Sequence, residues 1–152
     1  LFSLRVAIMR PNGLKFIPDD DVELFKTGKD SIDLLPDIDF GDDDEGLPIV
    51  LSCHILSKAV AKIFDLRYID GYFYTNAQHS WVLTPNDNII DVYPVGIFGG
   101  PILIHGEQFC PSSWLYRQDP KMKPSFLQFD DPHFIRAVEM VISNFFRHTI
   151  TA

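Results

Sequence analysis

The sequence predicts a protein of the α+β class, in which amphipathic helices accompany strands that are joined by hairpins. Residues 55–64 carry apolar side chains at three- and four-residue steps, which is the period of an amphipathic helix. Residues 67–75, 80–84 and 89–93 follow as short segments of strand character with turn signals between them. A second apolar stripe over residues 134–146 predicts a C-terminal helix.

The length and composition predict a single domain, residues 1–152, with the composition of an ordinary soluble protein. Hydrophobic residues make up 46% of the 152 and charged residues 22%, and no apolar run approaches the roughly 20 residues of a membrane-spanning helix. The net charge of −8 argues against a nucleic-acid partner, because phosphate binding needs clustered basic residues. We expect no membrane association. Cys53 and Cys110 show no disulfide-framework spacing and residues 1–10 do not resemble a signal peptide, so a cytoplasmic location is expected.

The N-terminal third of the sequence predicts short strands and one short helix. Alternating apolar residues over 2–8 predict a strand, and a turn at 11–13 allows residues 14–17 to return as its partner. The aspartates at 19–21 are predicted to cap a short helix, Val22 to Lys26, which ends near Gly28. In the C-terminal half, we expect a short strand at 101–105 and irregular structure over 106–130.

An acidic segment covers residues 29–46 and is predicted to be a surface loop. Its glycine and glutamate spacing does not fit a calcium-binding EF-hand, so solvated carboxylates are expected rather than a metal site. No cofactor is expected either. The acidic loop at 37–45 supports one alternative for the whole chain, a non-catalytic protein-binding module that docks a basic partner.

Cys53, His79 and Asp91 are the candidate catalytic residues. Ser52 is placed to cap the helix that begins with Cys53, and a thiol at a helix N-terminus is favoured as the thiolate. The backbone N–H groups at this end can also stabilise an oxyanion. His79, at the start of a predicted strand, would act as general base, and Asp91 on the returning strand would orient its imidazole.

The hairpin register decides whether His79 and Asp91 meet. Both positions are odd-numbered, so both side chains can lie on one face of the sheet. They lie opposite each other if the hairpin is centred near Pro85, and we expect this register because Trp81 then faces Ile89.

A two-residue turn at 86–87 is the alternative register. It would place Asp91 across from Val82, and an asparagine would then have to orient His79. The order Cys, His, Asp carries no weight by itself, because a lone cysteine on an amphipathic helix is usually a core residue. The joint placement at a helix start, a strand start and a returning strand is what favours a nucleophile.

These motifs resemble the transglutaminase-like superfamily, which shares the core of papain-like cysteine enzymes. The resemblance covers about residues 48–94 and implies a helix that carries the nucleophile packed on an antiparallel sheet, with a catalytic core at about 48–105. It also implies the triad Cys53, His79 and Asp91. The matching positions are Cys53, Arg67, Tyr68, Gly71, Tyr72, His79, Trp81, Asp91 and Pro94.

The resemblance further implies a cysteine-dependent amide hydrolase or acyltransferase that works through a thioester. A protein glutamine or a peptide amide would be the substrate, with water or an amine as the second reactant, and peptidase, deamidase and transglutaminase activities are not distinguished. No tryptophan or glutamine precedes Cys53 to supply a second oxyanion donor. His54 is expected beside the site, and the other expected binding residues are Tyr72, Trp81 and Trp114.

Overall fold

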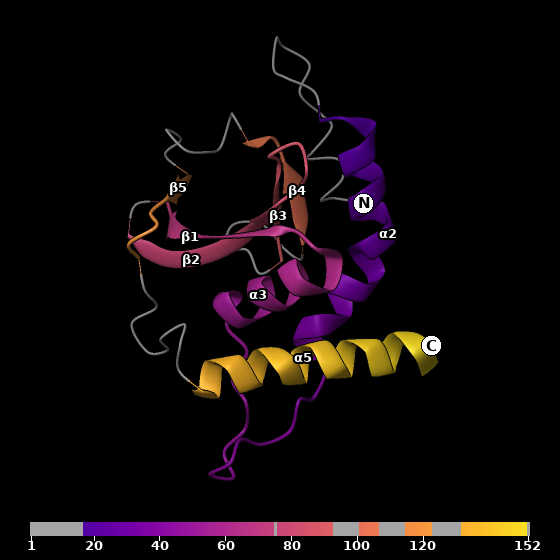
Figure 1. Cartoon of the computed structure of the whole chain (residues 1–152), viewed down its shortest axis with the longest axis vertical. Helices are drawn as coiled ribbons and strands as arrows, with labels where there is room; N and C mark the ends of the chain where they lie inside the picture. Colours follow the sequence, from indigo (N-terminus) through magenta and orange to yellow (C-terminus); the bar gives the residue numbers. More distant parts are fainter. Residues whose placement is uncertain (1–16, 75, 93–100, 107–114, 123–131, 152) are drawn as a thin grey trace.

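The computed structural model describes five segments of the chain (Figure 1), and all structural statements concern them: residues 17–74, 76–92, 101–106, 115–122 and 132–151. The predicted N-terminal strand lies outside these segments, and so do Pro94, Cys110 and Trp114. None of the helices in the described segments has the length and apolar character needed to cross a membrane.

The described segments form an α+β fold, as predicted. Figure 1 shows α3 lying against a curled antiparallel sheet, with the long helix α5 packed along α3 on the side away from the sheet. The strand order is β4-β3-β2-β1-β5. The helices are α2 (Asp19–Leu34), α3 (Cys53–Phe64) and α5 (Pro132–Thr151), with a 3-10 turn at Leu35–Asp37. The strands are β1 (Arg67–Phe73), β2 (Ala77–Leu83), β3 (Ile89–Asp91), β4 (Ile102–Ile104) and β5 (Tyr116–Gln118).

Helix α3 has the start and the buried stripe that the sequence predicts. The Ser52 hydroxyl accepts a hydrogen bond of 3.2 Å from the N–H of Ile55, which is an N-cap interaction. Asp65 adopts a left-handed conformation, with φ of 54°, and ends the helix. The apolar stripe is buried against the sheet and α5, through Ile55, Leu56, Ala59 and Val60.

The sheet is buried on both faces. Even-numbered residues of β2 and β3, such as Val82 and Ile90, pack with α2, α3 and α5 in one core cluster. Odd-numbered residues of β1, β2 and β3 point into the concave side of the sheet. With the even-numbered residues of β4 and β5 that pair with them, they form most of a second cluster. That second cluster contains Ile69, Phe73, Trp81, Leu83, Ile89, Ile102, Ile104, Leu115 and Tyr116.

Both predicted registers of the β2–β3 hairpin are wrong. Val82 pairs with Ile90 and Leu83 with Ile89, so the hairpin is centred on Asn86. Extending this pairing places Asp91 across from Trp81. The loop is one residue longer than a two-residue turn because Thr84 and Asn88 close it. The N–H of Thr84 donates to the Asn88 carbonyl at 2.8 Å, and the N–H of Asn88 donates to the Thr84 hydroxyl at 3.0 Å.

The first described helix is much longer than predicted. It extends from Asp19 to Leu34, so Gly28 lies inside it, and the predicted loop at 29–46 begins only after Asp37. Inside the helix, Gly28 allows close packing, because a Cβ at this position would lie 3.2 Å from the ring of Phe64.

Asp21 does not cap α2 but binds the β2–β3 turn. It is buried, and it accepts hydrogen bonds from the Thr84 hydroxyl (2.5 Å) and from the side-chain amides of Asn86 (3.0 Å) and Asn88 (2.8 Å). This contact between distant segments holds the turn in the observed register.

Strand β5 was not predicted from the sequence, because its three residues carry no readable period and their partner strand, β1, lies more than 40 positions earlier.

Candidate active site

The start of α3 lies beside a section of β2 that β3 does not cover. In the described residues, β3 pairs with β2 only at Val82 and Leu83. Ser57, one turn after Cys53, donates a hydrogen bond of 2.9 Å to the backbone carbonyl of Ser80 at this uncovered edge. The first turns of α3 therefore lie beside the part of β2 that carries His79 and Ser80.

His79 and Asp91 form a buried pair on the concave face of the sheet. Nε2 of His79 lies 2.8 Å from Oδ2 of Asp91, and both side chains are fully buried. The hydroxyl of Tyr116 donates to the same oxygen at 2.6 Å. The two residues meet although the predicted register is wrong, because shared parity keeps them on one face as diagonal neighbours.

This pairing fixes where the His79 proton lies. An ionised carboxylate is only an acceptor, so Nε2 carries the proton that faces Asp91 and Nδ1 is left for the thiol. Nδ1 is buried and has no hydrogen-bond partner of good geometry in the described residues. Burial lowers the pKa of His79, but the charge and hydrogen bond of Asp91, with a further contribution from Cys53, raise it from 6.5 to about 10.

Cys53 is a free cysteine that is half-buried at the first position of α3. Burial raises the pKa of its thiol, but interactions with the imidazoles of His54 and His79 outweigh burial and lower the pKa from 9.0 to about 6. Between about pH 6 and pH 10, thiolate and imidazolium are therefore the favoured forms of Cys53 and His79.

A second polar network lies on the α3 side of β2. Nδ1 of His54, which is buried, lies 2.6 Å from the Ser80 hydroxyl. That hydroxyl donates to Oδ1 of Asp70 at 2.7 Å and lies 2.9 Å from the hydroxyl of Tyr68. Burial raises the pKa of Asp70 despite these hydrogen bonds. The Lys58 ammonium lies 4.7 Å from the centre of the Tyr68 ring and covers this network on one side.

The structure brings four of the predicted site residues together: Cys53, His54, His79 and Asp91. Trp81 and Tyr72 are engaged in other contacts. Trp81 is fully buried, with its ring 6.1 Å from that of His79, and it shields the His79–Asp91 pair. Tyr72 lies on the opposite face from His79, and the guanidinium of Arg117 is 4.5 Å from its ring.

Sequence reasoning missed Ser80, Asp70 and Tyr116. Ser80 follows His79 directly and so points to the opposite face, and Asp70 is its cross-strand partner. Pairing the β1–β2 hairpin from its turn would have placed these two side chains together. Tyr116 lies on β5, which pairs with β1 and packs so closely on Gly71 that an added Cβ there would lie 2.1 Å from the Arg117 carbonyl oxygen. No feature of the sequence indicates that long-range contact.

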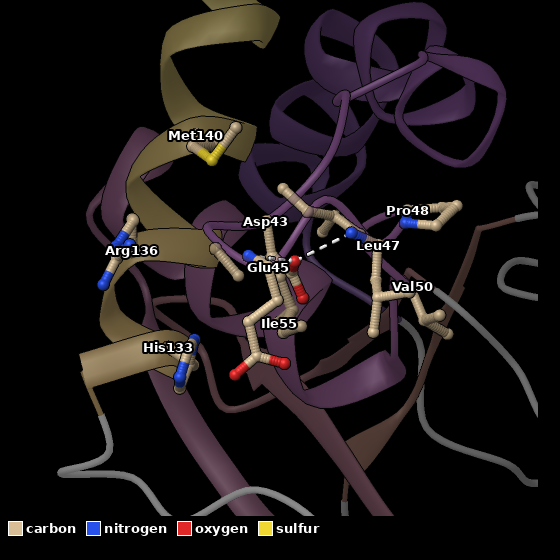
Figure 2. A pocket seen from close by; sticks show the side chains of 11 residues that line it. Asp43, Glu45, Leu47, Pro48, Val50, Ile55, His133, Arg136 and Met140 are labelled. Carbon is tan, nitrogen blue, oxygen red and sulfur yellow. Dashed lines mark hydrogen bonds between the residues drawn. The ribbon is translucent and has the colours of Figure 1, made fainter.

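A separate pocket of about 740 Å³ lies between residues 43–50 and α5 (Figure 2). Cys53, His79 and Asp91 do not line it. Leu47 and Val50 are exposed apolar residues on its wall, and Arg136 at its rim forms an ion pair with Asp44. Its other lining residues are Asp43, Glu45, Pro48, Ile49, Ile55, His133, Ala137 and Met140.

Among the described residues, no three His, Cys, Asp or Glu side chains are grouped as a metal ion would require. The arrangement instead combines a thiol of low pKa with an imidazole that a carboxylate orients, which are the parts of a nucleophilic site. No family model matches this chain, and neither a curated protein nor a solved structure gives a significant match to it.

Proposed function

We propose that this protein is a cysteine-dependent amide hydrolase or acyltransferase of the transglutaminase-like kind. One observation carries the proposal: the buried carboxylate of Asp91 lies 2.8 Å from Nε2 of His79, which leaves the buried Nδ1 of this imidazole unbonded among the described residues. Interactions with His54 and His79 also lower the pKa of the Cys53 thiol to about 6. A nucleophile, a base and a group that orients the base are the three parts of thiol catalysis on carboxamides. The packing of α3 on an antiparallel sheet fits the same papain-like arrangement.

In the proposed reaction, the Cys53 thiolate attacks the carbonyl carbon of a glutamine side chain or a peptide bond. The tetrahedral intermediate collapses when its C–N bond breaks, and the His79 imidazolium gives its proton to the departing ammonia or amine. Water or an amine then attacks the thioester and loses a proton to His79, and the C–S bond breaks to restore the thiolate. Asp91 stabilises the imidazolium throughout, without accepting its proton.

The helix start supplies one oxyanion donor in this scheme. The first N–H groups of a helix have no partner within the helix. At the start of α3, the N–H of Ile55 donates to the Ser52 side chain and that of Leu56 to the Ser52 carbonyl. The N–H of Cys53 itself is the group that we assign to the oxyanion, with support from the positive end of the helix dipole.

The pH dependence of Cys53 alkylation tests the proposal without knowledge of the substrate. Only the thiolate reacts with iodoacetamide, so labelling of Cys53 is expected to rise through about pH 6 and to stay level up to pH 9. A thiol of low pKa is also a weaker nucleophile. With a Brønsted coefficient of about 0.45, the net advantage over an ordinary thiol is about 20-fold at pH 6 and only about 4-fold at pH 7.

The midpoint of the pH profile is therefore the readout, and it is measured by mass spectrometry for Cys53 and Cys110 separately. We expect His79→Ala to raise the Cys53 midpoint by more than about one pH unit, because a charge-assisted partner is lost. His148→Ala, which removes an exposed imidazole on α5, is the control and is expected to leave the midpoint unchanged. A wild-type midpoint near 9 would refute the proposal.

A second candidate function is a peptide-binding module, and the pocket in Figure 2 is the observation that favours it. Its apolar wall and the carboxylates of Asp43 and Glu45 would suit a peptide with an apolar residue next to a lysine or arginine. This function predicts that Cys53→Ala keeps partner binding and that replacing Asp43 and Glu45 with Asn and Gln abolishes it. The enzyme proposal predicts that Cys53→Ala removes activity and that the loop variant retains it.

A further inference from the structure

Two hydrogen bonds join the start of α3 to a single residue of β2, Ser80. Nδ1 of His54 lies 2.6 Å from the Ser80 hydroxyl. The hydroxyl of Ser57, three positions further along the helix, donates to the Ser80 backbone carbonyl at 2.9 Å. All three side chains are buried, and the proposed mechanism assigns no role to any of them.

These bonds lie next to the candidate nucleophile and its base. His54 directly follows Cys53 at the start of α3, and Ser80 directly follows His79 on β2. A bond between residues 54 and 80 therefore limits how far Cys53 and His79 can move apart. Because His54 and Ser57 lie on the same face of the helix, the two bonds together restrict both the rotation of α3 and its position along β2.

The Ser80 hydroxyl is held in place by the sheet. It donates to Oδ1 of Asp70, its cross-strand partner on β1, at 2.7 Å. A serine hydroxyl has one proton and two acceptor lone pairs, so Nδ1 of His54 and the hydroxyl of Tyr68, which is 2.9 Å away, both donate to it. With every hydrogen-bonding position filled, Ser80 gives α3 a directional anchor on β1 and β2.

The remaining contacts of α3 are less specific about its position. Its apolar stripe, which includes Ile55 and Val60, is buried in the first core cluster, and hydrophobic burial has no preferred direction. The His79 imidazole is held independently of α3, by Asp91 and by the ring of Phe73 at 5.6 Å. The placement of the thiol against this imidazole therefore depends on where the start of α3 is held.

We propose that Ser80 is a positioning residue, which holds the Cys53 thiol against the His79 imidazole by anchoring His54 and Ser57. The inference rests on the proposed function, because it concerns the geometry of the same nucleophile and base. Ser80 touches no reacting atom in this role. A misplacement of about 1 Å in a catalytic site can lower the rate by about 100-fold, so an anchor one residue from each partner has a large effect.

The test measures the pH midpoint of Cys53 alkylation by iodoacetamide in the full chain, with Ser80→Ala in the wild-type and His79→Gln backgrounds. In the wild-type background, Ser80→Ala is expected to raise the midpoint by about one pH unit, because the thiolate loses its close contact with the imidazolium. In the His79→Gln background it should add no further rise. Equal midpoints for Ser80→Ala and the wild type would overturn the inference, and so would an equal rise in both backgrounds.

Val141→Ala is the control for a general loss of stability. Val141 is a fully buried residue of α5 in the first core cluster and makes no polar contact with Ser80. Its truncation is expected to lower stability in urea without moving the Cys53 midpoint. If Val141→Ala and Ser80→Ala raise the midpoint equally, a loosened core explains the effect and the positioning role is refuted.

Ser57→Ala provides a second variant, which carries the test if circular dichroism shows that Ser80→Ala does not fold. It removes one of the two bonds and is expected to raise the midpoint by less than Ser80→Ala does. A wild-type midpoint near 6 that Ser57→Ala and Ser80→Ala leave unchanged refutes the positioning role and leaves the proposed function standing. A wild-type midpoint near 9 refutes the proposed function and this inference with it.

Discussion

The acidic residues of this chain fall into two regions that behave differently. In the acidic loop at 37–45, Asp39 and Asp43 accept hydrogen bonds from backbone N–H groups two to four positions away. Asp44 of the same loop forms an ion pair with Arg136 at the surface. Around the sheet, Asp91 and Asp21 are buried and accept hydrogen bonds from side chains far away in sequence.

The difference lies in what surrounds each carboxylate. The loop carboxylates face water, where charge interactions are screened and local turns satisfy them. A buried carboxylate is stable only where several hydrogen-bond donors converge on it. Asp91 therefore stabilises one tautomer of His79, and Asp21 stabilises one register of the β2–β3 hairpin. A run of acidic residues is conspicuous in the sequence, yet the isolated buried aspartates are those that can change the chemistry of another group.

Asp91→Asn should have the largest effect on stability. The substitution keeps the volume of the side chain but removes the charge that faces the His79 imidazolium, and breaking a buried pair costs about 3 kcal/mol or more of unfolding free energy. Urea denaturation at pH 7 measures this, and the Cys53 alkylation midpoint should rise in the same variant. Asp87→Asn, at an exposed position of the same hairpin, is the control; a similar loss there would contradict the assignment.

Asp21→Ala should have an intermediate effect. It leaves the donors of Thr84, Asn86 and Asn88 without their shared acceptor, which we expect to lower the unfolding free energy by about 2 kcal/mol. Asp20→Ala, at an exposed position of the same helix, should change it by no more than about 0.5 kcal/mol. Equal stabilities for the two variants in urea would show that the contact of α2 with the turn does not stabilise the fold.

Asp44→Asn should have the smallest effect. The pair with Arg136 is exposed, and such pairs contribute about 0.5 kcal/mol or less. Neither the denaturation midpoint nor the alkylation profile of Cys53 is expected to change. A loss of more than about 1.5 kcal/mol would instead show that the loop is anchored on α5 as firmly as the buried carboxylates are anchored in the sheet.

Local signals predicted the elements that carry the candidate site. The capping hydroxyl of Ser52 and the period of α3 predicted a thiol at a helix start, and the parity of His79 and Asp91 predicted a shared face. The register within the hairpin was not predictable, because the donors that hold the turn bind Asp21, more than 60 positions earlier in the chain. The extent of α2 was misjudged because Gly28 looks like a helix end and instead packs against Phe64.

By itself, the sequence determined which residues could carry chemistry and which of them share a face, because these properties depend on helical and strand periods within one segment. Only the tertiary structure decided the environment of those residues. Burial, the second network of His54, Ser80 and Asp70, and the contact of Tyr116 with Asp91 all arise where separate segments meet. The pKa of a thiol depends on such neighbours and not on its place in the chain, so the low pKa of Cys53 follows from the fold.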